Sequence, residues 1–468
     1  MNKTIRPPRR ILVVLFLGVL MAALDIAIVG PTQRAIQEAF GIDERAFAWV
    51  FSVFVLCNLL GLPLMTKLAD VFGRRVLFIM DVLLFGLGSL VVALSPSFEI
   101  LLIGRGIQGV AASGIFPVAS AVIGDTFPPE KRGRALGVLG AVYGLAFIIG
   151  PIIAGILLQV GWSWVFLVNV PLAFIAAFLG YTFLPTLRPA EAKPLDWGGI
   201  VTLGVLLVSL AYGLNLIETD AFFSSITSLN VWPFLVFAMV LIPVFIRIEK
   251  KTAEPLLRLN LFRSRQVVLV SLFATGAGLT EAAFIFFPAF AIAAYGVADS
   301  TASFMLLPLA FAVAVSSPVA GRILDRVGSR AIVMAGSAGL AAGIGVMGLV
   351  PGGPAIFYLG TILVGFGLAA LLGSALSYIL LSESRATERT VVQGIITVFI
   401  SIGQTIGAAL IGAVVASSEG GVAGYTAAFL SIAGFSLVLT LLSFGLKKRA
   451  SELQAATQGV METEDSTP

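Results

Sequence analysis

Long apolar stretches separated by short polar loops dominate this chain. Each stretch has about 20 residues, which is enough for an α-helix to cross the roughly 30 Å hydrocarbon core of a bilayer. We therefore expect an all-α polytopic membrane protein. The pattern predicts fourteen membrane-spanning helices, at 11–30, 46–66, 76–95, 98–124, 134–158, 164–185, 198–217, 229–247, 266–295, 301–320, 331–350, 354–382, 391–417 and 424–446.

The composition excludes a soluble protein. Of the 468 residues, 58% are hydrophobic and 12% are charged, whereas soluble proteins carry about 25% charged residues. The apolar excess continues from Ile11 to Leu446 without a polar domain, which also excludes a soluble domain on a single anchor. The segment Met1–Gly30 imitates a signal peptide, but it contains Asp25 and lacks a cleavage site of small residues, so we expect it to be retained.

Three missing sequence features narrow the chemistry. The chain has no histidine, which excludes histidine relays and leaves proton transfer to carboxylates. Its single cysteine, Cys57, excludes an internal disulfide and a thiolate metal cluster, so we expect a packing role for it. No lysine follows a glycine, which excludes an ATP-driven pump with its own phosphate-binding loop. We expect no metal and no cofactor, with a proton gradient as the energy source.

The basic residues predict the orientation in the membrane. An even number of spans places both termini on one side, and all 29 Lys and Arg residues except Arg34, Arg45 and Arg105 then fall on that side. The positive-inside rule makes it the cytoplasmic side of the cell membrane. Residues 1–10 and the polar, disordered tail 447–468 are then cytoplasmic. Since the basic residues lie in short loops, we expect no nucleic-acid partner, and we expect a monomer to function.

Two cytoplasmic loops repeat each other, after the second span and after the tenth. The matched positions are Asp70 and Asp325, Gly73 and Gly328, and Arg75 and Arg330, separated by 255 residues in every pair. The repeat divides the chain into a six-helix bundle at 11–185, a linker with two inserted helices at 186–265 and a second six-helix bundle at 266–446. Parallel repeats are typical of alternating-access transporters, although either loop alone would also fit a helix-ending turn with basic topology residues.

Five segments carry a family resemblance. They are Leu24–Val29, the loop 66–78, Leu101–Ser113, the small-residue stretch 137–155 with Gly150 and Pro151, and Trp162–Pro171. These segments resemble motifs of the major facilitator superfamily, and specifically of its fourteen-helix drug:proton antiporter family. In that superfamily the motif matched by 137–155 marks exporters.

The resemblance implies a major facilitator fold with fourteen helices, arranged as six, two and six. It also implies a secondary active exporter that exchanges protons for lipophilic, often cationic drugs by alternating access, and thereby gives multidrug resistance. The alternative on the same scaffold is an exporter or flippase of an endogenous lipid or amphiphile. An enzyme is not expected, because the sequence offers no convergent nucleophile and base.

Two carboxylates lie near mid-membrane. Asp25 and Glu281 lie about 21 Å and 22 Å along their helices. They are 256 residues apart, which nearly equals the repeat period of 255, so they occupy corresponding places in the two halves. Charges inside a span are costly and are functional candidates. Our hypothesis is that at least one of them binds the coupling proton and meets a cationic substrate, with Arg105 tuning a carboxylate. The alternatives are a static Asp25–Arg105 ion pair and a packing role for Glu281 beside Thr280.

The remaining candidates are polar, aromatic or loop residues. Asp81 is interpreted as an interfacial partner of Arg75. The predicted substrate cavity comprises Asp25, Asn58, Arg105, Gln108, Tyr143, Glu281, Phe284, Tyr378, Gln393 and Gln404. The predicted gating residues are Asp70, Gly73, Arg74, Arg75, Asp325, Gly328, Arg330, Gly150 and Pro151.

The resemblance assigns Asp70 to a latch that closes the cytoplasmic side in the outward-facing state. We expect Asp70→Ala to reduce turnover more than substrate binding, because a latch acts on the conformational change and not on the bound ligand. Binding and transport measured on the same vesicles check this, and unchanged turnover would contradict the latch.

Overall fold

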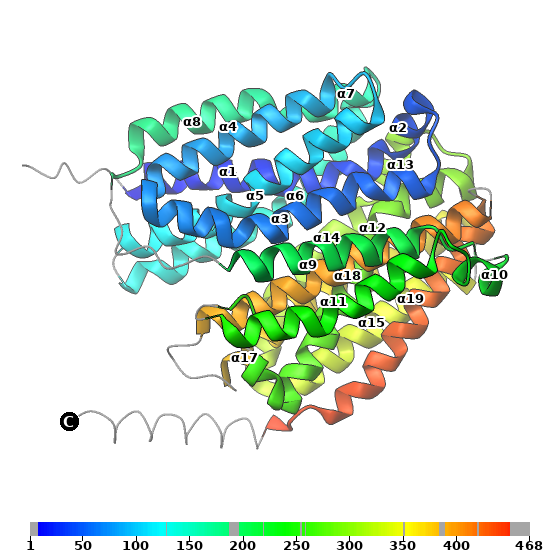
Figure 1. Cartoon of the computed structure of the whole chain (residues 1–468). Coiled ribbons are helices and arrows are strands. Elements are labelled where there is room, and N and C mark those ends of the chain that lie inside the picture. Colours follow the sequence, from blue (N-terminus) through cyan, green and yellow to red (C-terminus); the bar gives the residue numbers. More distant parts are fainter. Residues whose placement is uncertain are drawn as a thin grey trace, which may run out of the picture. The chain divides into compact units, whose positions relative to one another are not determined.

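The computed structural model describes residues 8–127, 129–186, 196–218, 220–252, 255–257, 259–349, 352–382, 389–418 and 421–449. Every regular element in these residues is a helix (Figure 1). Thirteen helical segments are long and apolar enough to cross a membrane. The predicted span 134–158 corresponds to helix α6, whose apolar part Gly144–Leu157 is shorter. The all-α membrane fold and the fourteen predicted helices are thus confirmed.

The helices that correspond to the first six predicted spans agree with them closely, and two of these spans consist of more than one element. They are α1 (Pro8–Val29) with η1 (Gly30–Thr32) and α2 (Gln33–Phe40), α3 (Glu44–Phe72), α4 (Arg74–Ala93), α5 (Phe98–Thr126), α6 (Pro129–Leu157), and α7 (Trp162–Leu167) with α8 (Asn169–Phe183).

The other eight spans follow in the same order. The inserted pair is α9 (Trp197–Asn215) and α11 (Trp232–Lys251), joined by the short α10 (Phe222–Ile226). The remaining helices are η2 (Leu259–Arg263), α12 (Arg265–Tyr295), α13 (Asp299–Phe304), α14 (Leu307–Val327), α15 (Ser329–Leu349), α16 (Gly353–Ala370), the π-helical turn η3 (Leu371–Ala375), α17 (Leu376–Ser382), α18 (Arg389–Ser417), α19 (Val422–Leu442) and η5 (Ser443–Gly445).

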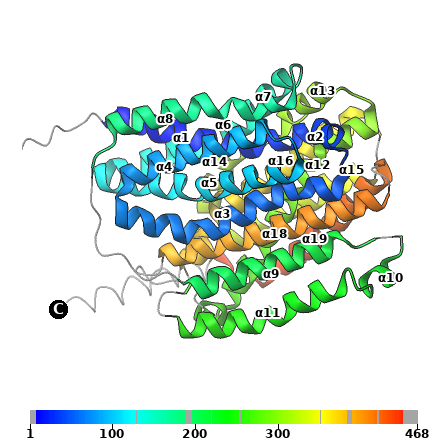
Figure 2. The ribbon, with the colours of Figure 1, turned by 45° about the horizontal axis from the view of Figure 1, so that its top comes forward.

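The chain forms two compact units. The first comprises 1–208, 285–292 and 297–307, and the second comprises 209–284, 293–296 and 308–468. In the first unit α5 packs along α3 and α4, while α8 packs along α4 and α1, and both views show α4 beside α8 (Figures 1 and 2). In the second unit α15 packs between α16 and α19. The division at 11–185, 186–265 and 266–446 remains a prediction.

The repeated loops have the same backbone geometry. Gly73 separates α3 from α4 with φ 89°, and Gly328 separates α14 from α15 with φ 87°. Residues with a Cβ rarely adopt this conformation, so glycine permits two helices to join without an intervening loop. The glycine therefore ends a helix in both copies, and the repeat is structural as well as sequential.

The first span extends further than the sequence predicted. Helix α1 ends at Val29, but the helical path continues, because a 3-10 turn at Gly30–Thr32 carries the chain on into α2. The Thr32 hydroxyl donates to the Val29 carbonyl at 2.7 Å within this turn. Gly30 is needed there, since a Cβ would lie 2.7 Å from the carbonyl oxygen of Ile285. Arg34, predicted to be outside the membrane, thus lies on α2 and not in a loop.

The inserted pair α9 and α11 packs through small and aromatic residues. Tyr212 of α9 and Phe234 of α11 make an edge contact with ring centroids 4.6 Å apart. A Cβ on Gly213 would lie 2.7 Å from a Leu235 methyl group. Close approach of this kind drives helix association in lipid, where burial from water does not.

Helices α12 and α18 cross at a pair of glycines. A Cβ on Gly278 would lie 2.1 Å from the Ile400 carbonyl oxygen, and one on Gly403 would lie 2.0 Å from the Thr275 carbonyl oxygen. Both distances are shorter than a van der Waals contact, so the crossing has no room for a methyl group. This crossing brings the helix that carries Glu281 against the helix that carries Gln404.

We expect Gly278→Ala to lower the stability by about 1–3 kcal/mol, because the added methyl group overpacks the crossing. Gly434→Ala is the matched control, since Gly434 on α19 has open space around its Cβ position and alanine favours a helix. Thermal unfolding of both variants in detergent measures the difference. Equal melting temperatures would show that the crossing is not tightly packed.

Candidate functional site

A buried ion pair lies at the centre of the first unit. Arg105 of α5 donates from Nη1 to Asp25 Oδ2 of α1 at 2.5 Å, and both side chains are 0% exposed. A charge-assisted bond of this length is among the strong hydrogen bonds of proteins. The Asp25–Arg105 ion pair is thus present in this structure, and the alternative that it is static stays open.

Neutral polar groups complete the shell around Asp25. Gln108 accepts from Arg105 Nη1 at 2.7 Å and donates from Nε2 to Asp25 Oδ1 at 2.9 Å. The Nδ2 of Asn169, on α8, donates to the same carboxylate oxygen at 3.2 Å. Ser89 of α4 accepts from Gln108 Nε2 at 2.8 Å. Three helices therefore meet at one carboxylate, α4 joins them through Gln108, and both oxygens of the carboxylate are satisfied.

Arg105 is also held by backbone and by aromatic rings. Its Nε donates to the Val50 carbonyl of α3 at 2.9 Å, and its guanidinium lies 4.5 Å from the ring centroid of Phe54. Contact with a ring face stabilises a cation away from water. The other terminal nitrogen, Nη2, is buried without a hydrogen-bond partner in the described part of the chain. The Nη2 group therefore remains an unsatisfied donor beside the ion pair.

Sequence reasoning identified Asp25, Arg105 and Gln108 but missed Asn169 and Ser89. Asn169 lies in the segment Trp162–Pro171 that carries the family resemblance, so it had a sequence signal that was not assigned to the site. Ser89 had no signal, because one serine in an apolar helix does not identify its partner. Asn58 of α3 contacts the Gly109 carbonyl at 3.4 Å, at the edge of this cluster.

Glu281 has a different environment in the second unit. Gln404 of α18 donates from Nε2 to Glu281 Oε2 at 2.9 Å, so two predicted cavity residues meet. Glu281 is half-buried, and among the described residues no Lys or Arg lies within ion-pair distance of it. Thr280 donates to the Gly276 carbonyl of its own helix. The hydrogen bond from Gln404 also fits the alternative of a hydrogen-bonded packing role for Glu281, which stays open.

The structure describes the side chains of some of the other predicted cavity residues and not of others. Phe284 is buried on α12, and Tyr378 is half-buried on α17. The side chains of Tyr143 and Gln393 lie outside the described residues, as do those of the gating candidates Asp70 and Asp325.

The gating arginines tie the start of α4 to its neighbours. Arg74 Nη1 donates to the Ala121 carbonyl of α5 at 2.6 Å. Arg75 donates to the Thr186 hydroxyl at 2.9 Å and to the Tyr181 carbonyl, and it stacks 4.8 Å from the Tyr181 ring centroid. The interpretation of Asp81 as a partner of Arg75 is therefore wrong, because the arginine reaches back to the end of α8.

The second repeat copies this arrangement. Arg330, equivalent to Arg75, stacks 5.3 Å from the ring centroid of Phe444. Phe444 follows α19, the last helix of its half, just as Tyr181 lies near the end of α8. In each half an arginine from the repeated loop thus contacts an aromatic residue of the final helix.

The gating candidates of α6 make close helix contacts. A Cβ on Gly150 would lie 2.6 Å from the Ala27 Cβ of α1, and one on Gly155 would lie 2.8 Å from the Phe304 ring of α13. Pro151 lies inside α6 between these contacts. Small residues in the stretch 137–155 therefore permit close approach, as the sequence predicted.

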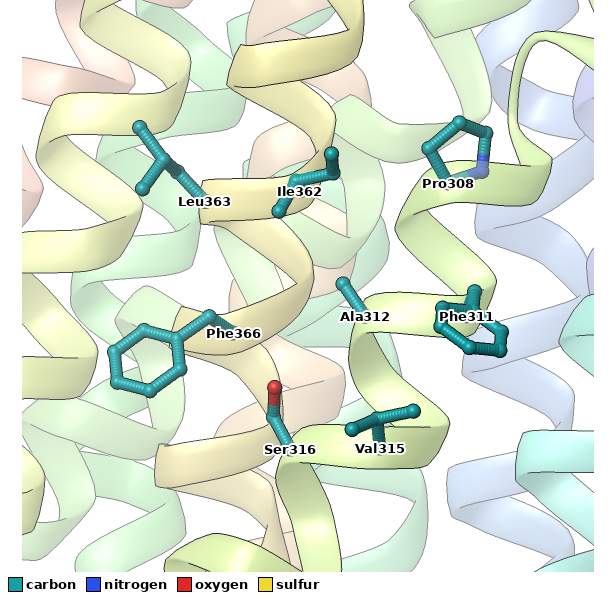
Figure 3. Close-up of a pocket in the computed structure, with 8 residues that line it drawn as sticks. All are labelled: Pro308, Phe311, Ala312, Val315, Ser316, Ile362, Leu363 and Phe366. Carbon is teal, nitrogen blue, oxygen red and sulfur yellow. The ribbon is translucent and has the colours of Figure 1, made fainter.

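An apolar groove of about 470 Å³ lies between α14 and α16, and none of the predicted cavity residues lines it (Figure 3). The close-up places Ala312 of α14 opposite Ile362 and Phe366 of α16. Gly365 permits the approach, since a Cβ there would lie 2.6 Å from the Leu309 carbonyl oxygen. The full lining is Pro308, Phe311, Ala312, Val315, Ser316, Ile362, Leu363 and Phe366.

We expect Asp25→Asn to destabilise the protein by about 3–5 kcal/mol, because it leaves Arg105 buried without a counterion. Adding Arg105→Met should restore part of this loss, since the unpaired charge disappears. Glu38→Gln is the control: Glu38 pairs with Arg34 in water, and such pairs contribute about 1 kcal/mol or less. Unfolding of the three variants in detergent measures these differences. An Asp25→Asn variant as stable as wild type would contradict the coupling between Asp25 and Arg105.

Comparisons with known proteins agree with the fold. The profile of the Major Facilitator Superfamily matches residues 15–379 and 267–463. An uncharacterized MFS-type transporter, YfiU of Bacillus subtilis, is 32% identical over 396 residues, which are 83% of this chain and 76% of that protein. The multidrug transporter protein MdtP of the same organism is 29% identical over 90% of this chain and 78% of its own length.

A solved structure supports the same fold. It is a bacterial homolog of the human lysosomal transporter Spinster in an inward-facing and occupied conformation, with a TM-score of 0.67 and 15% identity over 93% of this chain and 96% of that one. The matched profile, the relatives and the fourteen helices agree with one another: the chain belongs to the major facilitator superfamily and is a multi-pass membrane protein with a transport role.

Proposed function

We propose that this protein is a proton-coupled exporter of lipophilic, often cationic compounds, and that it works by alternating access. The observation that carries the proposal is the pair of membrane carboxylates at equivalent places of the repeat, Asp25 and Glu281. Its membrane topology, with both termini in the cytoplasm, belongs to the same proposal. The name of its relative MdtP supports drugs as the substrate class.

The two carboxylates suit different tasks. Asp25 is sealed and fully hydrogen-bonded, and Arg105 cannot give up its charge, so a proton or a cation reaches Asp25 only after the network rearranges. Glu281 has one neutral partner and is half-buried, so it can exchange a proton against a cation without breaking an ion pair. We therefore assign the exchange to Glu281 and the conformational response to Asp25.

Competition between proton and cation gives antiport. A membrane carboxylate without a counterion favours its neutral form, and a bound cation favours the ionised form. Arrival of a cationic substrate at Glu281 thus expels the proton, and a new proton displaces the substrate on the other side. A ligand drives such a cycle only through its differential affinity for the two conformations.

The second candidate function is export or flipping of an endogenous lipid or amphiphile. The apolar groove between α14 and α16 favours it, because Phe311 and Ile362 are exposed on a helix face that would meet lipid. A groove of about 470 Å³ has the size and lining for an acyl chain. This candidate predicts movement of a lipid that depends weakly on the proton gradient.

Reconstituted vesicles with imposed pH gradients separate the two candidates. We expect gradient-driven export of a lipophilic cation, and we expect Glu281→Gln to uncouple it, since glutamine keeps the shape and cannot release a proton. Asp25→Asn, compared at equal amounts of folded protein, should slow export, and Glu38→Gln should leave it unchanged. Wild-type coupling in both membrane variants would contradict the proposal, and lipid movement alone would favour the second candidate.

A further inference from the structure

Asp81 is a buried carboxylate that neither the proposed exchange nor the topology uses. It lies on α4, seven residues after the helix begins, which is about 10 Å along the axis. Its side chain is 1% exposed. An acidic side chain this deep in a membrane helix is costly and calls for a partner or a function.

No partner satisfies it in the described residues. Asp81 Oδ2 is buried without a hydrogen bond, and no Lys or Arg lies within ion-pair distance of it. Instead the carboxyl group packs on Gly114 of α5, where a Cβ would lie 2.1 Å from Oδ2. The same Cβ position is 3.0 Å from the Met65 Cβ of α3. Three helices thus close around one carboxyl group.

The helices that pack most extensively against α4 are α3, α5, α7 and α8. Gly18 of α1 also meets Phe78 and Val82 of α4, and the charges of α1 are Arg9 and Arg10 at its start and Asp25, which is bound to Arg105. Helices α7 and α8 contain no charged residue. The charges of α3 and α5, and those at the start of α4 itself, lie towards the helix ends or are bonded elsewhere. They are Glu44, Arg45, Lys67 and Asp70 on α3, Glu99, Arg105 and Asp125 on α5, and Arg74 and Arg75 on α4.

Three of these cations have other partners, and Lys67, two residues after Met65, makes no ion pair with Asp81 among the described residues. Arg105, nine residues before Gly114 and about 14 Å along the helix, is bound to Asp25. Arg74 and Arg75 bind the ends of α5 and α8. An isolated carboxylate in so dry a site is less stable than the neutral acid, because nothing replaces its hydration.

We propose that Asp81 is an additional proton-binding site, which holds its proton while α3, α4 and α5 are packed around it and releases the proton when water enters between them. The release would be tied to gating, because Asp81 lies about two turns from Arg74 and Arg75 on the same helix. Movement of the repeated loop moves the start of α4, and with it the seal over Asp81. This link to transport rests on the proposed function, whereas the proton site itself does not.

Infrared spectra of the full-length protein in lipid vesicles test the proton site. We expect wild type at neutral pH to show protonated-carboxyl absorption to which Glu281 also contributes, with one component that is lost in Asp81→Asn and kept in Asp299→Asn, a control with a partly exposed carboxylate beside Arg34. Gly114→Ala should shift that component, because the methyl group takes the space of the carboxyl oxygen. Identical wild-type and Asp81→Asn spectra would overturn the proposal.

Transport across a range of pH tests the link to gating. Asp81→Asn should fold and melt as wild type does, since a neutral side chain replaces a neutral side chain, but its transport rate should lose one titration step. Asp299→Asn should keep that step. A wild-type pH profile in Asp81→Asn would overturn the link, and a lower melting temperature would indicate an ionised, structural Asp81. If wild type exports no cation, the proposed function fails while the infrared result still decides the proton site.

Discussion

A charge inside a membrane must be neutralised by the protein itself, and the Asp25–Arg105 pair is where this chain meets that constraint most strictly. Burying both ions is expensive, and their attraction offsets the expense only when the remaining donors and acceptors are also satisfied. Arg105 Nη2 is the donor of the pair that stays without a hydrogen bond among the described residues. Gln108 and Asn169 satisfy the Asp25 carboxylate and Ser89 holds Gln108, so α1, α4, α5 and α8 are held in one register around the pair. The same hydrogen bonds therefore stabilise the packing of the first unit and determine the environment of the Asp25 carboxylate.

Close packing of backbones is the second condition, because lipid gives helices no hydrophobic reason to associate. Polar side chains as short as Gln108 and Asp25 reach each other only across narrow crossings. A Cβ on Gly88 of α4 would lie 2.9 Å from the backbone nitrogen of Gln108, so this glycine brings α4 against the network. The Gly278 and Gly403 crossing has the same effect for Glu281 and Gln404.

Sequence reasoning predicted what depends on local pattern. The helices, the repeated loops with Gly73 and Gly328, and the membrane position of Asp25, Arg105 and Glu281 all follow from periodicity and charge. It could not predict which residues meet in space: Asn169 and Ser89 were missed, and Arg75 binds Tyr181 and Thr186 in place of Asp81. Those contacts depend on how the helices rotate against one another, which an apolar sequence with few polar positions does not specify.

The two halves share the contacts of the repeated loops and differ in the partners of their membrane carboxylates. Arg75 and Arg330 both stack on an aromatic residue of the last helix of their half, so the loops anchor alike. The corresponding carboxylates differ in their partners among the described residues: Asp25 has an arginine and two amides, and Glu281 has a single amide. A pair with a permanent cation is costly to open and suits a conformational switch, whereas a carboxylate with one neutral partner exchanges its ligand readily. In the exchange that we propose, this asymmetry assigns binding to the site in one half and the conformational response to the site in the other.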